Sequence, residues 1–103
     1  MDIIYSKKVT TEILELSKKY NGFNDLYYPL IKVIVTYPRR CDADIRQCND
    51  CVIYIRENTR RTYNLSSHTL KIAYCIEEKK DIEYIRILAV KMSLFSEKKN
   101  NNI

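Results

Sequence analysis

The chain has 103 residues, and its hydrophobic share of 46% and charged share of 30% predict one folded domain rather than a disordered chain. Its net charge of +5 favours anionic partners. The single glycine excludes a glycine-rich phosphate loop and a dinucleotide-binding fingerprint, and no apolar run approaches the roughly 20 residues of a membrane span.

The opening residues MDIIYSKKV lack the apolar core of a signal peptide, so we expect an intracellular protein without a membrane partner. The chain is rich in Ile, Lys, Asn and Tyr and poor in Gly and Ala, a usage that AT-rich codons produce. This bias indicates an AT-rich genome, such as that of certain viruses, parasites or thermophilic archaea and their viruses. Among these we expect a viral or mobile-element origin, and with it the cytoplasm of a host cell.

The first predicted elements are a strand at residues 2–5 and an amphipathic helix at 9–21. Apolar residues recur in the second segment at helical spacing, at Val9, Ile13, Leu16 and Tyr20. Asn21 and Gly22 follow, and both residue types tolerate the left-handed backbone conformation that ends many helices.

The middle of the chain predicts strands and one long loop. Branched residues between two prolines, in LIKVIVTY at 30–37, indicate a mostly buried strand. A second strand is expected at 51–57, a turn at Asn58-Thr59, and a short return strand at 61–65. Residues 38–51 then form a long cysteine-rich loop between the first two of these strands.

The last third predicts a hairpin. TLKIAYCIEE at 69–78 alternates like a strand, and the polar turn EEKKD connects it to 82–95. The spacing in 82–95 also suits a helix, but its branched residues and the tight turn before it favour a strand. The sequence therefore predicts an α+β domain over 1–95: one N-terminal amphipathic helix packed on an antiparallel sheet of four to five strands. The polar tail at 96–103 is expected to be disordered.

The second face of this sheet is open to three interpretations. It is expected to carry Lys32, Arg56, Lys71 and several tyrosines. Such a face is solvated, pairs with a second copy in a homodimer, or binds a partner.

The four cysteines have two structural interpretations. Cys48 and Cys51 form a C-x2-C pair, which with Cys41 and either His68 or Cys75 would supply the four ligands of a zinc site. The same cysteines, Cys41, Cys48, Cys51 and Cys75, are candidates for disulfides, and a bridge from Cys41 would close the long loop. Because C-x2-C opens a strand here, redox catalysis is not expected. Structural thiols or disulfides are favoured, so no cofactor is expected and zinc is the alternative.

Arginine and tyrosine are interleaved in two short segments, Tyr37-Pro38-Arg39-Arg40 and Arg60-Arg61-Thr62-Tyr63. Arginine neutralises phosphates and tyrosine stacks on bases, so this combination is typical of nucleic-acid binding. The candidate nucleic-acid-binding residues are Tyr37, Arg39, Arg40, Arg46, Arg56, Arg60, Arg61 and Tyr63. The two segments share one edge if the strand end at 37 lies near the turn at 58–61. The alternative is a solvated basic surface with half-packed tyrosines.

Two segments are similar to RelE/ParE-type toxins: MDIIYSKKVTTEILELSKKY to their opening strand and helix, and LKIAYCIEEKKDIEYIRILAV to their closing hairpin. Together they cover about forty residues. Those proteins usually place a second helix where this chain has LIKVIVTY and the cysteine loop. The resemblance implies a toxin that cleaves mRNA or poisons gyrase through basic residues of the sheet. It carries over no catalytic residue at any one position.

These patterns lead to three functional hypotheses. The first is a small, basic, non-enzymatic accessory protein that binds nucleic acid or an acidic protein surface. The second is a protein-interaction module, a homodimer without nucleic-acid binding. The third is a RelE/ParE-like toxin, the one hypothesis in which the protein is an enzyme.

Overall fold

The structure is a computed structural model that describes residues 1–40, 44–48, 51–61 and 66–96. In chain order it contains β1 (Asp2–Tyr5), α1 (Lys7–Lys19), α2 (Phe23–Thr36), β2 (Asp44–Cys48), β3 (Cys51–Arg61), β4 (Ser66–Lys79) and β5 (Ile82–Ser96). The predicted strand at 61–65 lies outside the described residues except for Arg61. The predicted tail at 96–103 lies outside them except for Ser96.

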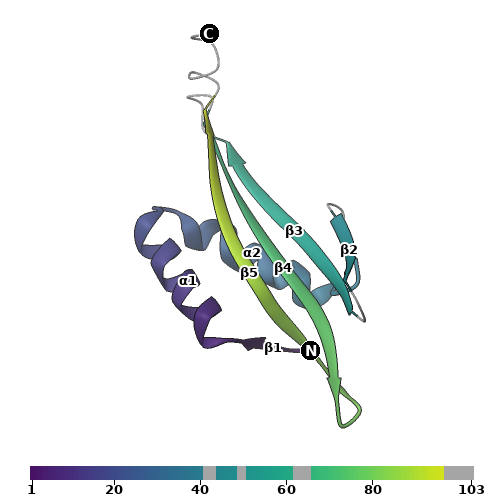
Figure 1. The fold of residues 1–103 in the computed structure, drawn as a ribbon. Helices are drawn as coiled ribbons and strands as arrows, with labels where there is room; N and C mark the ends of the chain where they lie inside the picture. The colour runs from purple at the N-terminus through teal and green to yellow at the C-terminus, as the bar shows by residue number, and fades with distance from the viewer. Residues whose placement is uncertain (41–43, 49–50, 62–65, 97–103) are drawn as a thin grey trace.

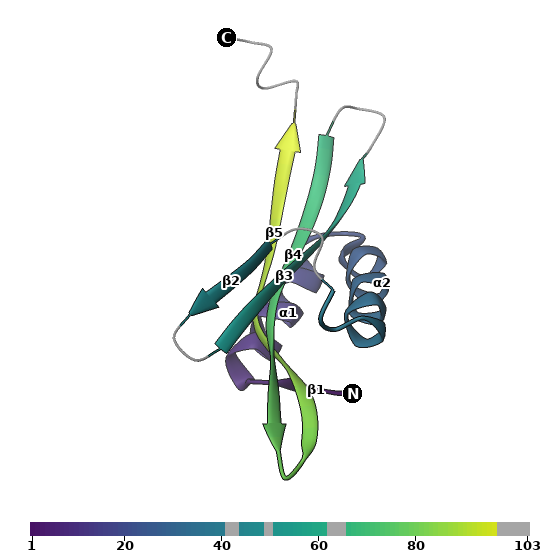
Figure 2. The ribbon, with the colours of Figure 1, turned by 90° about the vertical axis from the view of Figure 1, so that its right-hand side faces the viewer.

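The five strands form one mixed sheet in the order β1-β5-β4-β3-β2, with β1 parallel to β5 and the other neighbours antiparallel. Both helices cover the same face of this sheet. The opposite face, called the open face below, is turned toward the viewer in Figure 1, and Figure 2 shows the layers from the side. The α+β class is confirmed. The prediction of a wholly antiparallel sheet beneath a single helix is wrong, because β1 pairs in parallel and α2 is a second helix.

α1 begins at a serine cap. The Ser6 hydroxyl accepts a hydrogen bond from the Val9 amide at 3.1 Å, which satisfies one of the free amides of the first turn. Val9 is buried, and three further residues of the apolar spacing pack against the same core: Ile13, Leu16 and Tyr20. Lys18 and Lys19 occupy the last turn, where the helix dipole favours positive charge.

The strand predicted at 30–37 is wrong, because these residues continue the helix α2. The buried residues of α2 recur at the spacing of one helix face: Phe23, Leu26, Tyr27, Leu30 and Ile34. That spacing starts well before LIKVIVTY, so this segment taken alone shows only its β-branched residues, which favour a strand. Burial of the whole helix face outweighs this local strand propensity. Pro29 lies exposed within the helix and lacks the amide that would bond to the Asp25 carbonyl. Packing of the buried face offsets that loss.

The region predicted as a long loop contains an edge strand. β2 pairs antiparallel with β3, and the register places Cys48 opposite Cys51. β3 then continues through Asn58-Thr59, where the sequence predicts a turn. The Asn58 amide donates instead to the Leu26 carbonyl of α2 at 3.1 Å. This bond gives Asn58, inside a strand, the backbone partner that asparagine otherwise finds in turns.

The hairpin predicted from 69–78 and 82–95 is confirmed, and the helical alternative for its second arm is wrong. Lys80 and Asp81 form the turn with φ angles of 53° and 65°. Two successive positive angles give a two-residue turn whose twist matches that of the flanking strands. β4 and β5 stay paired over their whole length, with one register shift beside Ala73.

The core lies between the two helices and the sheet. The middle strands supply Leu70, Ile72, Tyr74, Ile85, Ile87 and Val90. Tyr74 is fully buried, and its hydroxyl donates to the Pro38 carbonyl at 2.9 Å, which ties the chain after α2 to a central strand. Within the described chain, neither helix has the length and apolar character that crossing a membrane requires.

Candidate functional site

The structure separates the first arginine–tyrosine segment from Arg60, the residue of the second segment whose side chain it describes. Tyr37-Pro38-Arg39-Arg40 follows the C-terminal end of α2, whereas Arg60 lies beside Asp25 in the first turn of that helix. α2 has 14 residues, and at the usual helical rise its two ends are about 20 Å apart. The expected shared edge is wrong, since it depends on a strand end at 37 and a turn at 58–61, and neither forms.

The segment that follows α2 is held by internal contacts. Arg56 is 9% exposed, and its Nη1 donates to the Arg40 carbonyl at 2.6 Å. The Arg39 guanidinium pairs with Glu83, and that of Arg40 lies 5.9 Å from the centroid of the Tyr37 ring. Arg56 therefore supports the fold rather than facing a partner, while Arg39 and Arg40 stay exposed.

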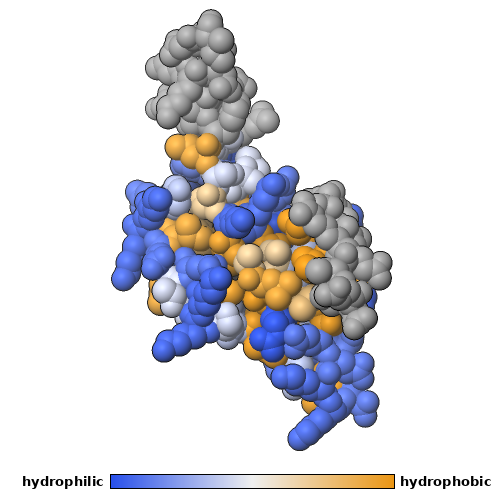
Figure 3. Space-filling view, in the orientation of Figure 1, coloured by the Kyte–Doolittle hydropathy of each residue, from blue (hydrophilic) through white to orange (hydrophobic). Residues whose placement is uncertain are grey.

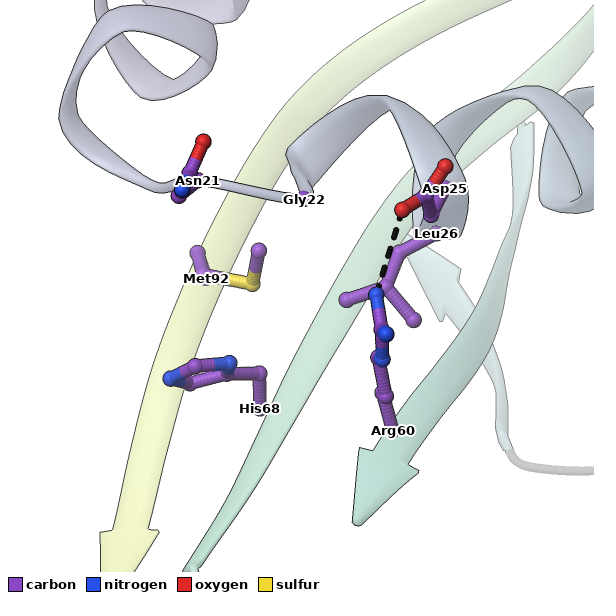
Figure 4. Close-up of a pocket in the computed structure, with 7 residues that line it drawn as sticks. All are labelled: Asn21, Gly22, Asp25, Leu26, Arg60, His68 and Met92. Carbon is purple, nitrogen blue, oxygen red and sulfur yellow. Dashed lines mark hydrogen bonds and ion pairs between the residues drawn. The ribbon is translucent and has the colours of Figure 1, made fainter. Parts of the chain in front are cut away.

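A pocket of about 370 Å³ opens at the other end of α2, beside the loop that joins the two helices. It is called the Arg60 pocket below, and its lining residues are Asn21, Gly22, Asp25, Leu26, Arg60, His68 and Met92 (Figure 4). These come from the loop, from α2 and from strands β3, β4 and β5. The pocket thus unites Arg60, a predicted nucleic-acid contact, with His68, a predicted alternative zinc ligand.

Arg60 reaches the pocket from β3 and forms an ion pair with Asp25, whose Oδ2 lies 3.1 Å from Nη1. The two side chains are 57% and 72% exposed. An exposed pair of this kind contributes only about 0.2–1 kcal/mol, so another anion can replace Asp25 with little loss of stability.

Gly22 shapes the rim of the pocket. Its φ angle of 88° is left-handed, and a β-carbon at this position would lie 3.4 Å from Nη1 of Arg60. The only glycine of the chain therefore permits the left-handed turn between the helices, and a β-carbon there would only touch the guanidinium.

His68 faces the pocket from β4, and the sheet register places it directly opposite Arg60. Its ring meets the Tyr20 ring edge-on, with centroids 6.3 Å apart. Lys19 Nζ lies 5.5 Å from the centroid of the same tyrosine ring. Contacts therefore run from the pocket to the basic end of α1.

Three other predicted nucleic-acid contacts have no described side chain. Arg46 and Arg61 are in β2 and β3, with Cα positions opposite Ile53 and Ser67. Their side chains, and the whole of Tyr63, lie outside what the structure describes. Among the predicted nucleic-acid contacts with described side chains, Arg60 alone lines the pocket.

Four tyrosines pack internally rather than offering their rings to bases: Tyr20, Tyr27, Tyr54 and Tyr74. Burial, together with the hydrogen bond between its hydroxyl and that of Tyr5 at 2.8 Å, raises the pKa of Tyr27 above its usual value. Tyr28 and Tyr37 are exposed at 65% and 53%, but neither lines the Arg60 pocket. The pocket therefore favours contact with phosphate over stacking on bases.

The two alternatives for a fourth zinc ligand are far apart. His68 and Cys75 lie on the same strand, β4, and seven residues of strand span about 23 Å. Cys75 is buried, and it points to the open face because its neighbour Tyr74 points to the helices. Across the side chains that the structure describes, no three His, Cys, Asp or Glu residues are placed to hold a metal ion. The side chains of Cys41, Cys48 and Cys51 lie outside that set, so their zinc and disulfide interpretations stay predictions.

The open face has an apolar centre, visible as the orange region over the middle of the sheet in Figure 3. Strand register places Ile55, Ala73 and Ala89 in one row of this face. Of the residues expected there, Lys71 lies on it and pairs with Glu57 at 3.8 Å. The other two placements are wrong, because Arg56 turns toward the helices and Lys32 belongs to α2.

Sequence reasoning missed the residues that surround Arg60 and His68. Asn21 and Gly22 carry a detectable signal, the helix stop, and that signal locates the rim of the pocket. Asp25 and Met92 carry none: Asp25 is 35 positions from Arg60, and the two meet only because α2 is helical.

No protein-family model, curated protein or solved structure matches the chain.

Proposed function

We propose that the protein binds nucleic acid through the Arg60 pocket and the adjoining basic end of α1. The observation that carries the proposal is the position of Arg60, a largely exposed guanidinium in a pocket, opposite His68 and paired with a replaceable carboxylate. Lys18 and Lys19 extend the basic surface beyond the pocket.

Phosphate is the anion that this arrangement suits best. A guanidinium presents a planar fork of donors that matches phosphate oxygens, and lysines beside it act as point charges on neighbouring phosphates. Contacts of this kind supply most of the affinity of sequence-independent nucleic-acid binding. The net charge of +5 acts in the same direction by attracting polyanions from solution.

Fluorescence anisotropy with short single- and double-stranded DNA and RNA tests the proposal. Affinity should fall steeply as salt rises from about 50 to 200 mM. Arg60→Ala should weaken binding several-fold and lower the slope of log affinity against log salt by about one unit.

Arg39→Ala is the matched control, because it removes the same charge and another exposed ion pair at the opposite end of α2. It should leave affinity near that of the unmodified protein. Absence of binding at about 50 mM salt would contradict the proposal, and so would equal losses in the two variants.

A RelE/ParE-type toxin is the second candidate, and α2 is the observation that favours it. The resemblance implies a second helix in the middle of the chain, and α2 occupies Phe23–Thr36. The order of one strand, two helices and then further strands is compatible with both segments that carry the resemblance. Lys71 and Lys91, which lie opposite each other on β4 and β5, are basic residues of the sheet on which such an activity would depend.

Controlled expression in bacteria separates the two candidates. A toxin should arrest growth and cleave RNA or inhibit gyrase, and joint replacement of Lys71 and Lys91 by alanine should relieve the arrest. Joint replacement of Lys7 and Lys8, two exposed lysines of α1, is the control for lost charge. Harmless high-level expression without RNA cleavage or gyrase inhibition would count against a toxin and leave the binding proposal standing.

A further inference from the structure

The Arg60 pocket is shaped for one small group rather than for a length of duplex. Its volume of about 370 Å³ is near the lower end of the range for small-molecule sites, roughly 300–1,000 Å³. Figure 4 shows Arg60 and His68 on neighbouring strands, on two sides of the space. Leu26 and Met92 supply apolar surface, and Asn21 lies above. Donor side chains and apolar surface therefore meet within the space of about one nucleotide.

We propose that this pocket binds the terminal phosphomonoester of a single-stranded nucleic acid, with its terminal nucleoside against Leu26 and Met92. The inference rests on the proposed function and specifies which part of the nucleic acid enters the pocket. A 5′ phosphate and a 3′ phosphate share this chemistry.

The ion pair with Asp25 is the reason for choosing a monoester. Arg60 already has a partner of one negative charge at 3.1 Å. A phosphodiester also carries one charge, so it replaces that carboxylate with a smaller gain than a monoester does. A monoester carries about 1.5 to 2 negative charges at neutral pH and has three acceptor oxygens, so it competes better for the guanidinium.

Each pocket residue then makes a different contact with the ligand. The Arg60 guanidinium binds the phosphate, and the facing His68 ring and the exposed Asn21 amide supply further donors. Gly22 forms the rim beside Nη1, where a β-carbon would make an ordinary contact at 3.4 Å. The lysines of the last turn of α1 meet the phosphates that follow the terminal one.

The test compares short single-stranded oligonucleotides of one sequence carrying a 5′ phosphate, a 3′ phosphate or hydroxyls at both ends. One phosphorylated form should bind on the order of tenfold more tightly than the hydroxyl form, as one added charge-assisted contact predicts. A nucleoside monophosphate, titrated by calorimetry, should bind alone and compete with that oligonucleotide.

Variants test whether the preference for a phosphorylated end depends on the Arg60 pocket. Arg60→Ala should remove the preference for the phosphorylated end, and Arg39→Ala should retain it. Asp25→Asn should raise the affinity for the phosphorylated form several-fold, because it removes the competing carboxylate while keeping the shape of the side chain. Thermal denaturation of each variant establishes that it is folded.

The outcomes separate this inference from the proposed function. Salt-dependent binding that needs Arg60 but ignores end phosphates would overturn the inference and leave the function standing. A nucleoside monophosphate that binds through Arg60, with no affinity for unphosphorylated strands, would support the pocket and overturn general nucleic-acid binding. No binding of any of these probes would overturn both.

Discussion

Arg39 and Arg60 have nearly the same local chemistry in very different surroundings. Their side chains are 56% and 57% exposed, and each guanidinium pairs with an exposed carboxylate, Glu83 or Asp25. Arg39 lies in a segment that buried side chains hold in place, whereas Arg60 lines a pocket with a histidine directly opposite. Exposure and charge alone therefore do not distinguish a binding site, while a concave surface with converging donors does.

The largest expected effect lies at the Arg39 end of α2. Arg56→Ala removes a buried donor and leaves the Arg40 carbonyl without that bond. The free energy of unfolding should fall by about 1–3 kcal/mol, measured by urea denaturation followed by circular dichroism. Arg39→Ala should change it by less than about 0.5 kcal/mol. Equal effects of the two substitutions would mean that Arg56 is not the anchor of this segment.

The rim of the Arg60 pocket comes next. Gly22 has a left-handed backbone with φ of 88°, so Gly22→Ala should lower the free energy of unfolding by about 1–2 kcal/mol. Gly22→Asn is the matched variant, because asparagine tolerates this conformation, and it should lose less. If the two variants melt at the same temperature, backbone strain at Gly22 is not what selects glycine.

Double-mutant cycles compare the two ion pairs directly. Coupling between Arg60 and Asp25, and between Arg39 and Glu83, should be about 0.2–1 kcal/mol in each case, as for other exposed pairs. The cycles are measured by denaturation of the single and double alanine variants. A coupling well above this range at Arg60 would contradict the idea that a ligand readily displaces Asp25.

The smallest expected effect extends the comparison to a half-buried pair on the open face, Arg86 Nε and Glu77 Oε1 at 2.5 Å. The hydrogen bond from Arg86 holds the pKa of Glu77 below its usual value of 4.5. A carboxylate whose pKa is lowered in the folded state stabilises the protein at pH values above its usual pKa. This contribution is lost as the pH falls through the lowered pKa.

Glu77→Gln should therefore lower stability at neutral pH, and the difference from the unmodified protein should shrink as the pH drops below about 4.5. Denaturation midpoints from neutral to strongly acidic pH measure this difference. A difference that stays constant across the range would show that the Glu77 charge contributes nothing to it.

Elements with strong local signals could be predicted from the sequence. The apolar spacing around Ile13 indicates a helix where α1 lies, and the polar turn at Lys80-Asp81 indicates the β4–β5 hairpin. α2 could not be recognised from 30–37, because the apolar positions that define its buried face begin at Phe23. Its branched residues follow strand propensity when the rest of that face is left out.

The candidate site could be predicted from local sequence signals even less than α2. Arg60 and His68 stand out by residue type, but their juxtaposition is a property of register between β3 and β4. Asp25 joins them only when α2 is helical. The strand wrongly predicted at 30–37 therefore hides the ion pair of Arg60 with Asp25, and it places Tyr37–Arg40 beside Arg60 although they lie at opposite ends of α2. Long-range pairing of this kind has no local pattern in a single sequence.

The pairing of β1 with β5 also has a consequence for synthesis. β1 lies at the edge of the sheet beside β5, with Ile3 opposite Ile85. Of the strands that the structure describes, β1 is synthesised first but can pair only after β5 has been made, and β4 lacks one of its two neighbours until then. Such non-local pairing slows folding and exposes unpaired strands in the meantime. We expect nascent chains released before Ile82 to aggregate rather than to form a smaller version of the domain.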